Sequence, residues 1–206
     1  MDLFEQSLKR ALDFLIGSLL LVILSPILVV IAVLIKLDSR GPVIYRHLRI
    51  GHKGKPFYLY KFRSMTVGGD DSGYMEYLRQ LIESEQQGEG IPYRKMSSDS
   101  RVTRVGGFLR RYYLDEIPQL LNIIKGEMSL VGPRPLLQEF LDSYSKEDRL
   151  RMNMPPGMTG WQQVNGSATN TWEQRINLDL WYIDHWNIFI DMYVLITTIA
   201  VVLRAE

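Results

Sequence analysis

The sequence predicts an α+β protein that is mainly helical and is attached to a membrane near its N-terminus. Three observations indicate this fold class. Residues 14–35 are apolar and uncharged, and they are long enough to cross about 30 Å of hydrocarbon as a helix. Two short aromatic segments follow, which predict a small β-hairpin or sheet. Later segments carry apolar residues at helical spacing, which predicts amphipathic helices.

The apolar stretch is interrupted near its middle by Ser25 and Pro26. Proline removes a backbone donor, clashes with the preceding turn and biases Ser25 away from helical geometry. Basic residues flank both ends of the stretch, so the positive-inside tendency gives no orientation. The residues alone therefore fit two arrangements equally well: a spanning helix that contains a proline, and a helix–break–helix that returns to the same membrane face. A cleaved signal peptide does not fit, because charged residues follow the stretch directly.

The chain becomes more polar from Gly41, which divides it into a membrane anchor, residues 1–40, and one compact domain, residues 41–206. Residues 43–45 and 57–62 are expected to be strands, with a turn at 51–55 between them. An apolar pattern at helical spacing predicts an amphipathic helix over residues 74–86.

The clearest helix in the sequence begins at Leu114. Asp115 is a good N-cap residue, Pro118 is tolerated in the first turn, and Gly126 is expected to end the helix. A second amphipathic helix is expected over residues 136–150, a loop over 157–166, and a further helix over 171–186.

The last apolar segment covers residues 188–203 and contains one charged residue, Asp191. It is short for a membrane span, and Trp and Tyr collect at its start, as they do at membrane interfaces. We expect an amphipathic helix that lies on or near the membrane surface. The alternative is a buried helix of the protein core.

Composition excludes several classes of function. The net charge is +1, from 24 Lys and Arg against 23 Asp and Glu, so no nucleic-acid partner is expected. The chain has no cysteine, which excludes thiol catalysis. Its three histidines show no triad or metal spacing, and no Gly-x-Ser-x-Gly, Walker-type or Gly-x-Gly-x-x-Gly motif is present.

The adjacent carboxylates Asp115 and Glu116 are the first candidate for chemistry. At a helix start, free N–H groups and the helix dipole favour an ionised carboxylate, which suits a nucleophile or a metal ligand. Two adjacent carboxylates repel each other, so both stay ionised only beside a cation, and Mg²⁺ with bound phosphate fits this role. The alternative for an Asp-Glu pair at this position is a plain helix cap.

Basic residues around the pair favour a phosphate site. Four arginines, including Arg110, precede the pair, and Arg134 follows it between two prolines in a Gly-Pro-Arg-Pro turn. Arginine suits bidentate phosphate contacts, and a solvated basic face explains the rigid Arg134 poorly. Lys61 and Arg63 alternate along a predicted strand and would share one face. Asp179 and Tyr182 lie close together on a predicted helix.

The chain resembles the bacterial sugar transferase family, the monotopic phosphoglycosyl transferases, along nearly its whole length. Five runs match in order: Tyr-Lys-Phe-Arg-Ser-Met at 60–65, Leu-Asp-Glu-Ile-Pro-Gln-Leu-Leu-Asn at 114–122, Gly-Glu-Met-Ser-Leu-Val-Gly-Pro-Arg-Pro at 126–135, Pro-Gly-Met-Thr-Gly-Trp-Gln-Gln-Val-Asn-Gly at 156–166, and Asp-Leu-Trp-Tyr at 179–182. Glu127 stands where Asp is common in the family, and Ser64 where Thr is common. Neither departure affects a candidate catalytic residue.

The resemblance implies an enzyme that uses Mg²⁺ and transfers a sugar 1-phosphate from a UDP-sugar to polyprenyl phosphate, such as undecaprenyl phosphate. In this scheme Asp115 is the nucleophile that forms a phosphosugar intermediate and releases UMP, and Glu116 supports it or binds the metal. The expected substrate and phosphate contacts are Lys61, Arg63, Arg110, Arg134, Gln163, Asp179 and Tyr182.

The resemblance also implies a re-entrant hairpin broken at Ser25-Pro26. The catalytic domain would then lie on the cytoplasmic face of the bacterial inner membrane. Two other functions are compatible with the residues: a membrane-tethered Mg²⁺-dependent diphosphate hydrolase, and a non-catalytic membrane scaffold. The sugar, the pathway, the oligomeric state and the role of residues 66–98 do not follow from the sequence.

Overall fold

The computed structural model describes residues 3–68, 76–77, 80, 99, 101–138, 141, 144–167 and 170–203. Its fold is α+β and mainly helical, with a small sheet and one long apolar N-terminal helix, as the sequence predicts. The predicted helix at 74–86 lies almost wholly outside the described residues, of which Glu76, Tyr77 and Gln80 are helical.

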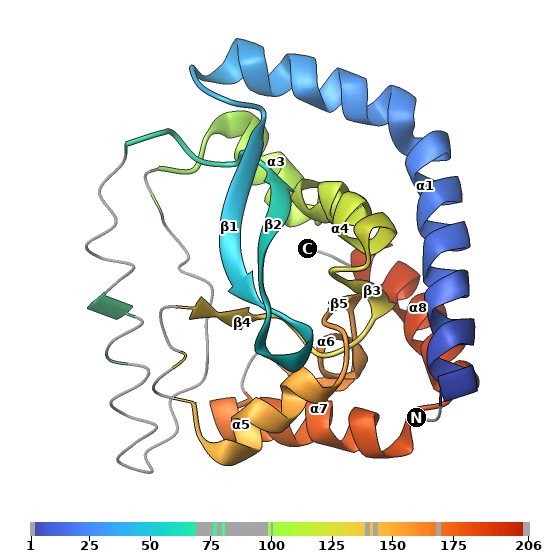
Figure 1. Cartoon of the computed structure of the whole chain (residues 1–206). Helices are drawn as coiled ribbons and strands as arrows, with labels where there is room; N and C mark the ends of the chain where they lie inside the picture. The colour runs from blue at the N-terminus through green and yellow to red at the C-terminus, as the bar shows by residue number, and fades with distance from the viewer. Residues whose placement is uncertain are drawn as a thin grey trace.

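Helix α1 (Leu3–Asp38) is a single helix that continues through Pro26, rather than two helices separated by a break. Figure 1 shows it bending sharply into two arms, one along the right-hand side and one across the top. Pro26 has no N–H to donate to the carbonyl of Val22, one turn earlier. The Ser25 hydroxyl donates to that oxygen instead, at 2.7 Å. The Ser-Pro pair therefore bends the helix without leaving a carbonyl unsatisfied.

The predicted hairpin is present and is longer than expected. Strands β1 (Ile44–Ile50) and β2 (Pro56–Phe62) pair antiparallel, and the short 3₁₀ helix η1 (His52–Gly54) joins them. A third strand, β4 (Leu136–Leu137), pairs with the end of β1 and gives the sheet order β2-β1-β4.

Strand β4 corrects the prediction of one helix over residues 136–150. Within that range only α5 (Lys146–Leu150) is an α-helix among the described residues, and a capping box at Ser145 and Asp148 begins it. Leu136 is buried beside Ile50 and Tyr144. Its contacts with the sheet outweigh the local helical spacing, which carries no information about distant strands.

The helix that was expected to begin at Leu114 starts as a 3₁₀ helix, η2 (Leu114–Gln119), and continues as α4 (Leu120–Lys125). Asp115 is not its N-cap, because Tyr113 occupies that position and Asp115 lies within the first turn. Gly126 ends α4 with a positive φ of 84°, as the sequence predicts. Helix α3 (Arg104–Arg111) precedes this segment and is capped by Thr103.

A second small sheet replaces the loop expected at 157–166. Strand β5 (Gly157–Thr159) pairs parallel with β3 (Ser129–Val131), and the short helix α6 (Trp161–Asn165) follows. A Cβ atom on Gly157 would lie 2.1 Å from the backbone nitrogen of Gly132, so two chain segments approach at a distance that only glycine permits. Strands of three residues that are stabilised by partners distant in sequence cannot be predicted from their local sequence.

The last two helices are confirmed. Helix α7 (Trp172–His185) begins with a capping box at Thr171, and α8 (Ile188–Leu203) follows. Helix α8 is not a buried core helix, because it exposes a row of large apolar side chains. These exposed residues are Phe189, Met192, Tyr193, Ile196, Ile199 and Leu203. Its buried residues are Asp191 and Val194.

The main core lies between the hairpin, α4, the β3–β5 sheet and the last two helices. Its most buried apolar residues are Leu59, Leu120, Ile123, Met128, Val131, Tyr182 and Val194. Figure 1 shows α1 wrapping this core from outside, with its N-terminal arm beside α8. Only 11% of the most apolar window of α1 is buried, so most of its apolar surface faces outward.

Candidate active site

Asp115 and Glu116 lie in the first turn of η2, which packs against strand β2. Tyr113, just before them, has a left-handed backbone with φ of 56°. Its carbonyl accepts a hydrogen bond from the Glu116 N–H, at 3.1 Å. Asp115 is buried, and the Glu116 side chain is only 14% exposed. The turn therefore holds two adjacent carboxylates in a largely desolvated place.

Two cations from distant parts of the chain meet this carboxylate pair. The Lys61 ammonium lies 2.5 Å from Glu116 Oε1 and 4.0 Å from Asp115 Oδ2. The Arg134 guanidinium lies 3.5 Å from the same Glu116 oxygen, with its side chain half exposed. Lys61 therefore offsets negative charge on both carboxylates, and Arg134 offsets negative charge on Glu116.

Strand β2 positions Lys61, and Asn122 of α4 fixes that strand. The fully buried Asn122 amide accepts a hydrogen bond from the Tyr60 N–H, at 3.0 Å, and donates to the Tyr58 carbonyl, at 2.7 Å. It also donates to Glu127. This bridge joins the strand to the helix that follows the carboxylate pair, so it sets the distance between Lys61 and Glu116.

The Gly-Pro-Arg-Pro turn positions Arg134. The Gly132 N–H donates to the Thr159 carbonyl and the Gly157 N–H donates to the Pro133 carbonyl, at 2.9 and 2.8 Å. These bonds hold the turn against β5. The backbone at Arg134 is therefore held rigidly, and its flexible side chain extends to Glu116.

A small pocket opens beside the pair, and it contains a cation that the sequence reasoning missed. Its lining includes Glu116, Gln119, Arg134, Gly157 and Arg49. Arg49 lies on β1, and its guanidinium contacts His47 Nδ1 at 3.1 Å. The sequence prediction ended this strand at residue 45, so the alternation of His47 and Arg49 was not read as one face. A longer strand in the prediction would have revealed it.

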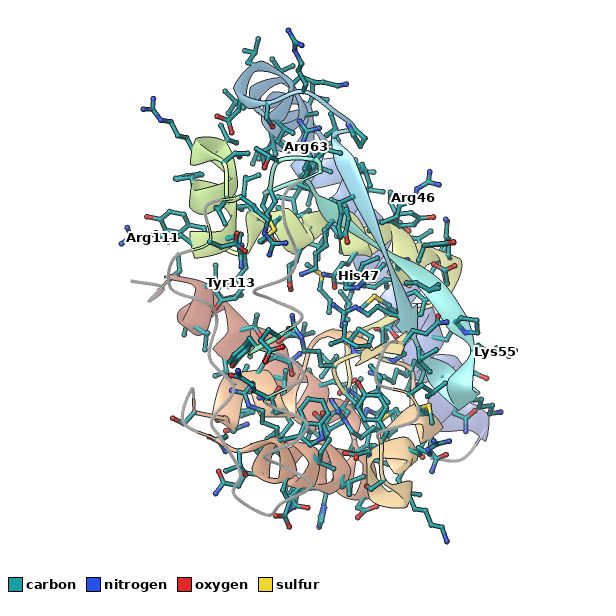
Figure 2. The ribbon with its side chains drawn as sticks, turned by 90° about the vertical axis from the view of Figure 1, so that its left-hand side faces the viewer. Arg46, His47, Lys55, Arg63, Arg111 and Tyr113 are labelled. Atoms are coloured by element: carbon teal, nitrogen blue, oxygen red, sulfur yellow. The ribbon has the colours of Figure 1, made fainter. Side chains whose placement is uncertain are left out.

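Arg63 does not join the site. It is buried, and its guanidinium donates to the carbonyls of Ile35 and Ser39 and to the Ser39 hydroxyl. Together with the Ser39 N–H, which also donates to the Ile35 carbonyl, it caps the C-terminal end of α1. Figure 2 shows Arg63 near that end of the molecule, away from His47.

Arg110 is half-buried on α3, with no hydrogen bond or ion pair to the part of the chain that the structure describes. Its neighbour Arg111 points outward from the molecule (Figure 2). The structure does not bring Arg110 to the carboxylate pair through any direct contact.

Asp179 and Tyr182 share helix α7 but bind different partners. Asp179 is 1% exposed and pairs with Arg151 at 2.5 Å. Burial raises the pKa of the Asp179 carboxyl, and the Arg151 guanidinium and the Arg134 backbone N–H oppose that rise. The fully buried Tyr182 hydroxyl donates to Asp191 at 2.6 Å, and burial raises its pKa well above the usual value. Neither side chain is accessible to a substrate.

Gln163 lies on α6, and an added Cβ on Gly160 would come within 2.7 Å of its Oε1 and 2.2 Å of the Gly132 carbonyl. Its side-chain amide is buried and has no hydrogen-bond partner among the described residues. Gln163 therefore lies close to the Gly-Pro-Arg-Pro turn, and among the described residues its side chain makes no hydrogen bond to the carboxylate pair.

The carboxylate pair fits one kind of metal site. The described residues contain no group of three His, Cys, Asp or Glu side chains that could hold an ion. Mg²⁺ is bound in many proteins by one or two carboxylates together with substrate phosphates, so Asp115 and Glu116 fit this ion when a phosphate is present.

Comparison with known proteins adds the family. The chain matches the bacterial sugar transferase family over residues 4–205. It is 37% identical over 199 residues to the uncharacterized sugar transferase EpsL of Bacillus subtilis, covering 97% of this chain and 89% of that protein. It is 38% identical over 201 residues to the undecaprenyl-phosphate galactose phosphotransferase of Salmonella typhimurium, covering 97% of this chain.

A third relative is the UDP-glucose:undecaprenyl-phosphate glucose-1-phosphate transferase of Escherichia coli, at 40% identity over 200 residues and 93% of this chain. The chain spans 41% of the Salmonella protein and 39% of the Escherichia coli protein, so it corresponds to one part of each. The match to EpsL, by contrast, covers nearly all of both chains. From its full-length match, this chain belongs to the bacterial sugar transferase family.

Proposed function

We propose that this enzyme transfers a sugar 1-phosphate from a UDP-sugar to polyprenyl phosphate. The observation that carries the proposal is the desolvated pair Asp115–Glu116 with Lys61 and Arg134 beside it. Phosphoryl transfer needs an oriented nucleophile and cations that offset charge on the phosphoryl oxygens. The names of the Salmonella and Escherichia coli relatives describe this reaction type with undecaprenyl phosphate as acceptor.

The reaction proceeds in two displacements on one phosphorus. An Asp115 oxygen attacks the phosphorus that carries the sugar, the bond from that phosphorus to the bridging oxygen breaks, and UMP leaves with the electron pair. An oxygen of polyprenyl phosphate then attacks the same phosphorus, and the bond to Asp115 breaks. The carboxylate is restored and the product is a polyprenyl diphosphate sugar.

Each cation has a distinct part in this scheme. Lys61, within 4.0 Å of both carboxylates, keeps Asp115 ionised for attack. Arg134 and Arg49 line the pocket beside Glu116 and bind the donor's phosphate oxygens there. Asp115 and Glu116 would hold Mg²⁺, which when bound would neutralise charge on those oxygens.

The membrane arrangement follows from the same chemistry. The acceptor phosphate lies at headgroup level, on a tail that stays in the bilayer. We propose that α1 enters and leaves one leaflet at its Ser25-Pro26 bend, and that α8 lies in the interface. The domain then lies on the cytoplasmic face of the bacterial inner membrane, where UDP-sugars are present.

The decisive experiment measures UMP release from a panel of UDP-sugars by the purified protein, with and without polyprenyl phosphate. We expect one equivalent of UMP without lipid and continuous release with it, and an Asp115→Asn variant should release none. Continuous release without lipid would indicate a hydrolase, and no release by the wild type with any sugar would favour a scaffold. The panel also identifies the sugar, because the two named relatives act on different ones.

A further inference from the structure

A buried ion pair lies next to the backbone of the Gly-Pro-Arg-Pro turn. Arg151 of the 3₁₀ helix η4 (Arg151–Asn153) and Asp179 of α7 lie 2.5 Å apart, with side-chain exposures of 5% and 1%. Figure 1 shows α7 along the lower edge of the molecule, where α5 overlaps part of it. Isolated buried charges are costly, so a pair this deep needs further partners.

The further partner of the ion pair is the backbone of Arg134. The Arg151 guanidinium donates to the Arg134 carbonyl at 3.2 Å. Asp179 in turn holds the Arg151 guanidinium through the ion pair. The pair therefore reaches the Arg134 backbone through its carbonyl.

The sequence of the turn makes these contacts matter. Pro133 and Pro135 have no N–H, so Arg134 supplies the sole backbone donor of these three residues. The Pro133 carbonyl already accepts from Gly157. Without the Arg151–Asp179 pair, the Arg134 carbonyl would lose the hydrogen bond that it accepts from Arg151.

We propose that Arg151 and Asp179 form a clamp that positions Arg134 for phosphate binding beside Glu116. They are positioning residues that act through the Arg134 backbone and do not touch the substrate. An arginine side chain is long and flexible. When its backbone is held in one orientation, the guanidinium can reach fewer positions. A 1 Å misplacement of a catalytic group can lower a rate by about 10²-fold.

The Arg151 guanidinium is itself held in place. It lies 5.7 Å from the Trp172 ring centroid, and that ring stacks on Tyr144 at 5.8 Å with an interplanar angle of 6°. The Trp172 indole N–H donates to Asp148 at 3.1 Å. Residues of α5 and α7 therefore hold the clamp in place. Its position depends on the packing of the domain and not on the turn.

The test replaces the ion pair by apolar residues of similar size, Arg151→Met with Asp179→Leu. Such replacements are often neutral for stability, so the variant is expected to fold with a Tm close to that of the wild type. Its kcat/KM for sugar-phosphate transfer should fall about 10- to 100-fold. Arg149→Met is the matched control, because the Arg149 guanidinium donates to the Leu141 and Tyr144 carbonyls and makes no hydrogen bond to Arg134 in the described part of the chain. It should leave kcat/KM unchanged.

A double-mutant cycle separates positioning from general packing. In an Arg134→Ala background the same double replacement should cause no further loss, because there is no guanidinium left to position. Losses that multiply in that background would overturn the proposal. So would wild-type activity of the folded double variant.

The activity arms of the test rest on the proposed function, so a second readout is needed that does not. Hydrogen exchange of the Arg134 amide should be slow in the wild type and at least tenfold faster in the double variant. Equal exchange rates would contradict the clamp. If the wild type transfers no sugar phosphate but the exchange difference is present, the proposed function fails and the clamp stands.

Discussion

At the scale of single residues, the site depends on where a few charges lie relative to Glu116. Lys61 and Arg134 approach the same Oε1 atom from different segments, at 2.5 and 3.5 Å. Arg63, two positions after Lys61, instead donates a hydrogen bond to the Ser39 carbonyl at the end of α1. Lys61 lies on β2 and Arg63 lies just beyond the end of that strand, and the two have unrelated tasks, one electrostatic and one structural.

The first prediction concerns Lys61. A Lys61→Met change removes the cation nearest to both carboxylates, so Asp115 becomes harder to keep ionised and kcat/KM should fall roughly 10²-fold. Steady-state UMP release with lipid measures this. Lys125→Met is the control, because Lys125 donates to the Tyr60 hydroxyl on the same strand and, among the described residues, forms no ion pair with Asp115 or Glu116. Equal losses in the two variants would remove Lys61 from the mechanism.

At the scale of elements, two helices give the protein its relation to the membrane. Helix α1 combines an apolar surface with a bend at Ser25-Pro26, and α8 combines a buried polar side with an exposed apolar row. Each helix therefore has a feature that a plain spanning helix or a plain core helix lacks.

The bend of α1 can be tested by topology. The chain has no cysteine, so Gln6→Cys and Arg40→Cys each introduce a single exposed thiol. A membrane-impermeant thiol reagent should label both from the same side of a sealed vesicle. Adding Pro26→Ala restores the missing N–H and straightens the helix, so labelling should move to opposite sides for at least part of the protein.

A Ser25→Ala variant serves as the control for that experiment. It keeps the proline but leaves the Val22 carbonyl without its donor, so the same-side labelling should persist. The loss of this hydrogen bond should lower stability by about 1 kcal/mol. Opposite-side labelling of Gln6→Cys and Arg40→Cys in proteins that keep Ser25 and Pro26 would contradict the re-entrant arrangement.

The orientation of α8 gives the third prediction. A polarity-sensitive dye attached at Phe189→Cys or Ile196→Cys should report an apolar environment when the protein is placed in lipid nanodiscs. Both side chains are largely exposed, at 77% and 67%. The same dye at Tyr58→Cys, exposed on the sheet, should report water. A water-like signal at all three positions would place α8 away from the bilayer.

At the scale of the whole molecule, polar residues of α1 join the membrane helix to the domain. Lys9 pairs with Asp191 of α8 at 2.5 Å, and Arg10 donates to the Ile123 and Ile124 carbonyls at the end of α4. Asp13 accepts from the Leu130 N–H on β3. The helix is therefore fixed to three separate elements, α8, α4 and β3.

The Lys9–Asp191 pair gives a prediction about stability. Lys9→Met leaves the buried Asp191 without its cation, although Tyr182 and Trp186 still donate to it. The free energy of unfolding should fall by about 3–5 kcal/mol. Combining Lys9→Met with Asp191→Leu removes the uncompensated charge and should recover much of this loss. Thermal unfolding in detergent measures both variants, and equal stability of the single variant and the wild type would contradict the prediction.

The sequence alone determined the features that depend on local chemistry. The uncharged run and its proline indicated the apolar helix, the aromatic segments indicated the hairpin, and Gly126 ended its helix as expected. The pair Asp115–Glu116 and the rigid Arg134 also stood out, because their spacing and flanking residues are unusual in themselves.

Only the tertiary structure decided how distant residues meet. It placed Leu136 in a strand, because β1 offered a free edge and a buried neighbour. It added Arg49 to the pocket, assigned Arg63 to the end of α1, and paired Asp179 with Arg151. The physical reason is that local spacing fixes which face a side chain shares with its neighbours, whereas its partners across the chain are fixed by packing and burial.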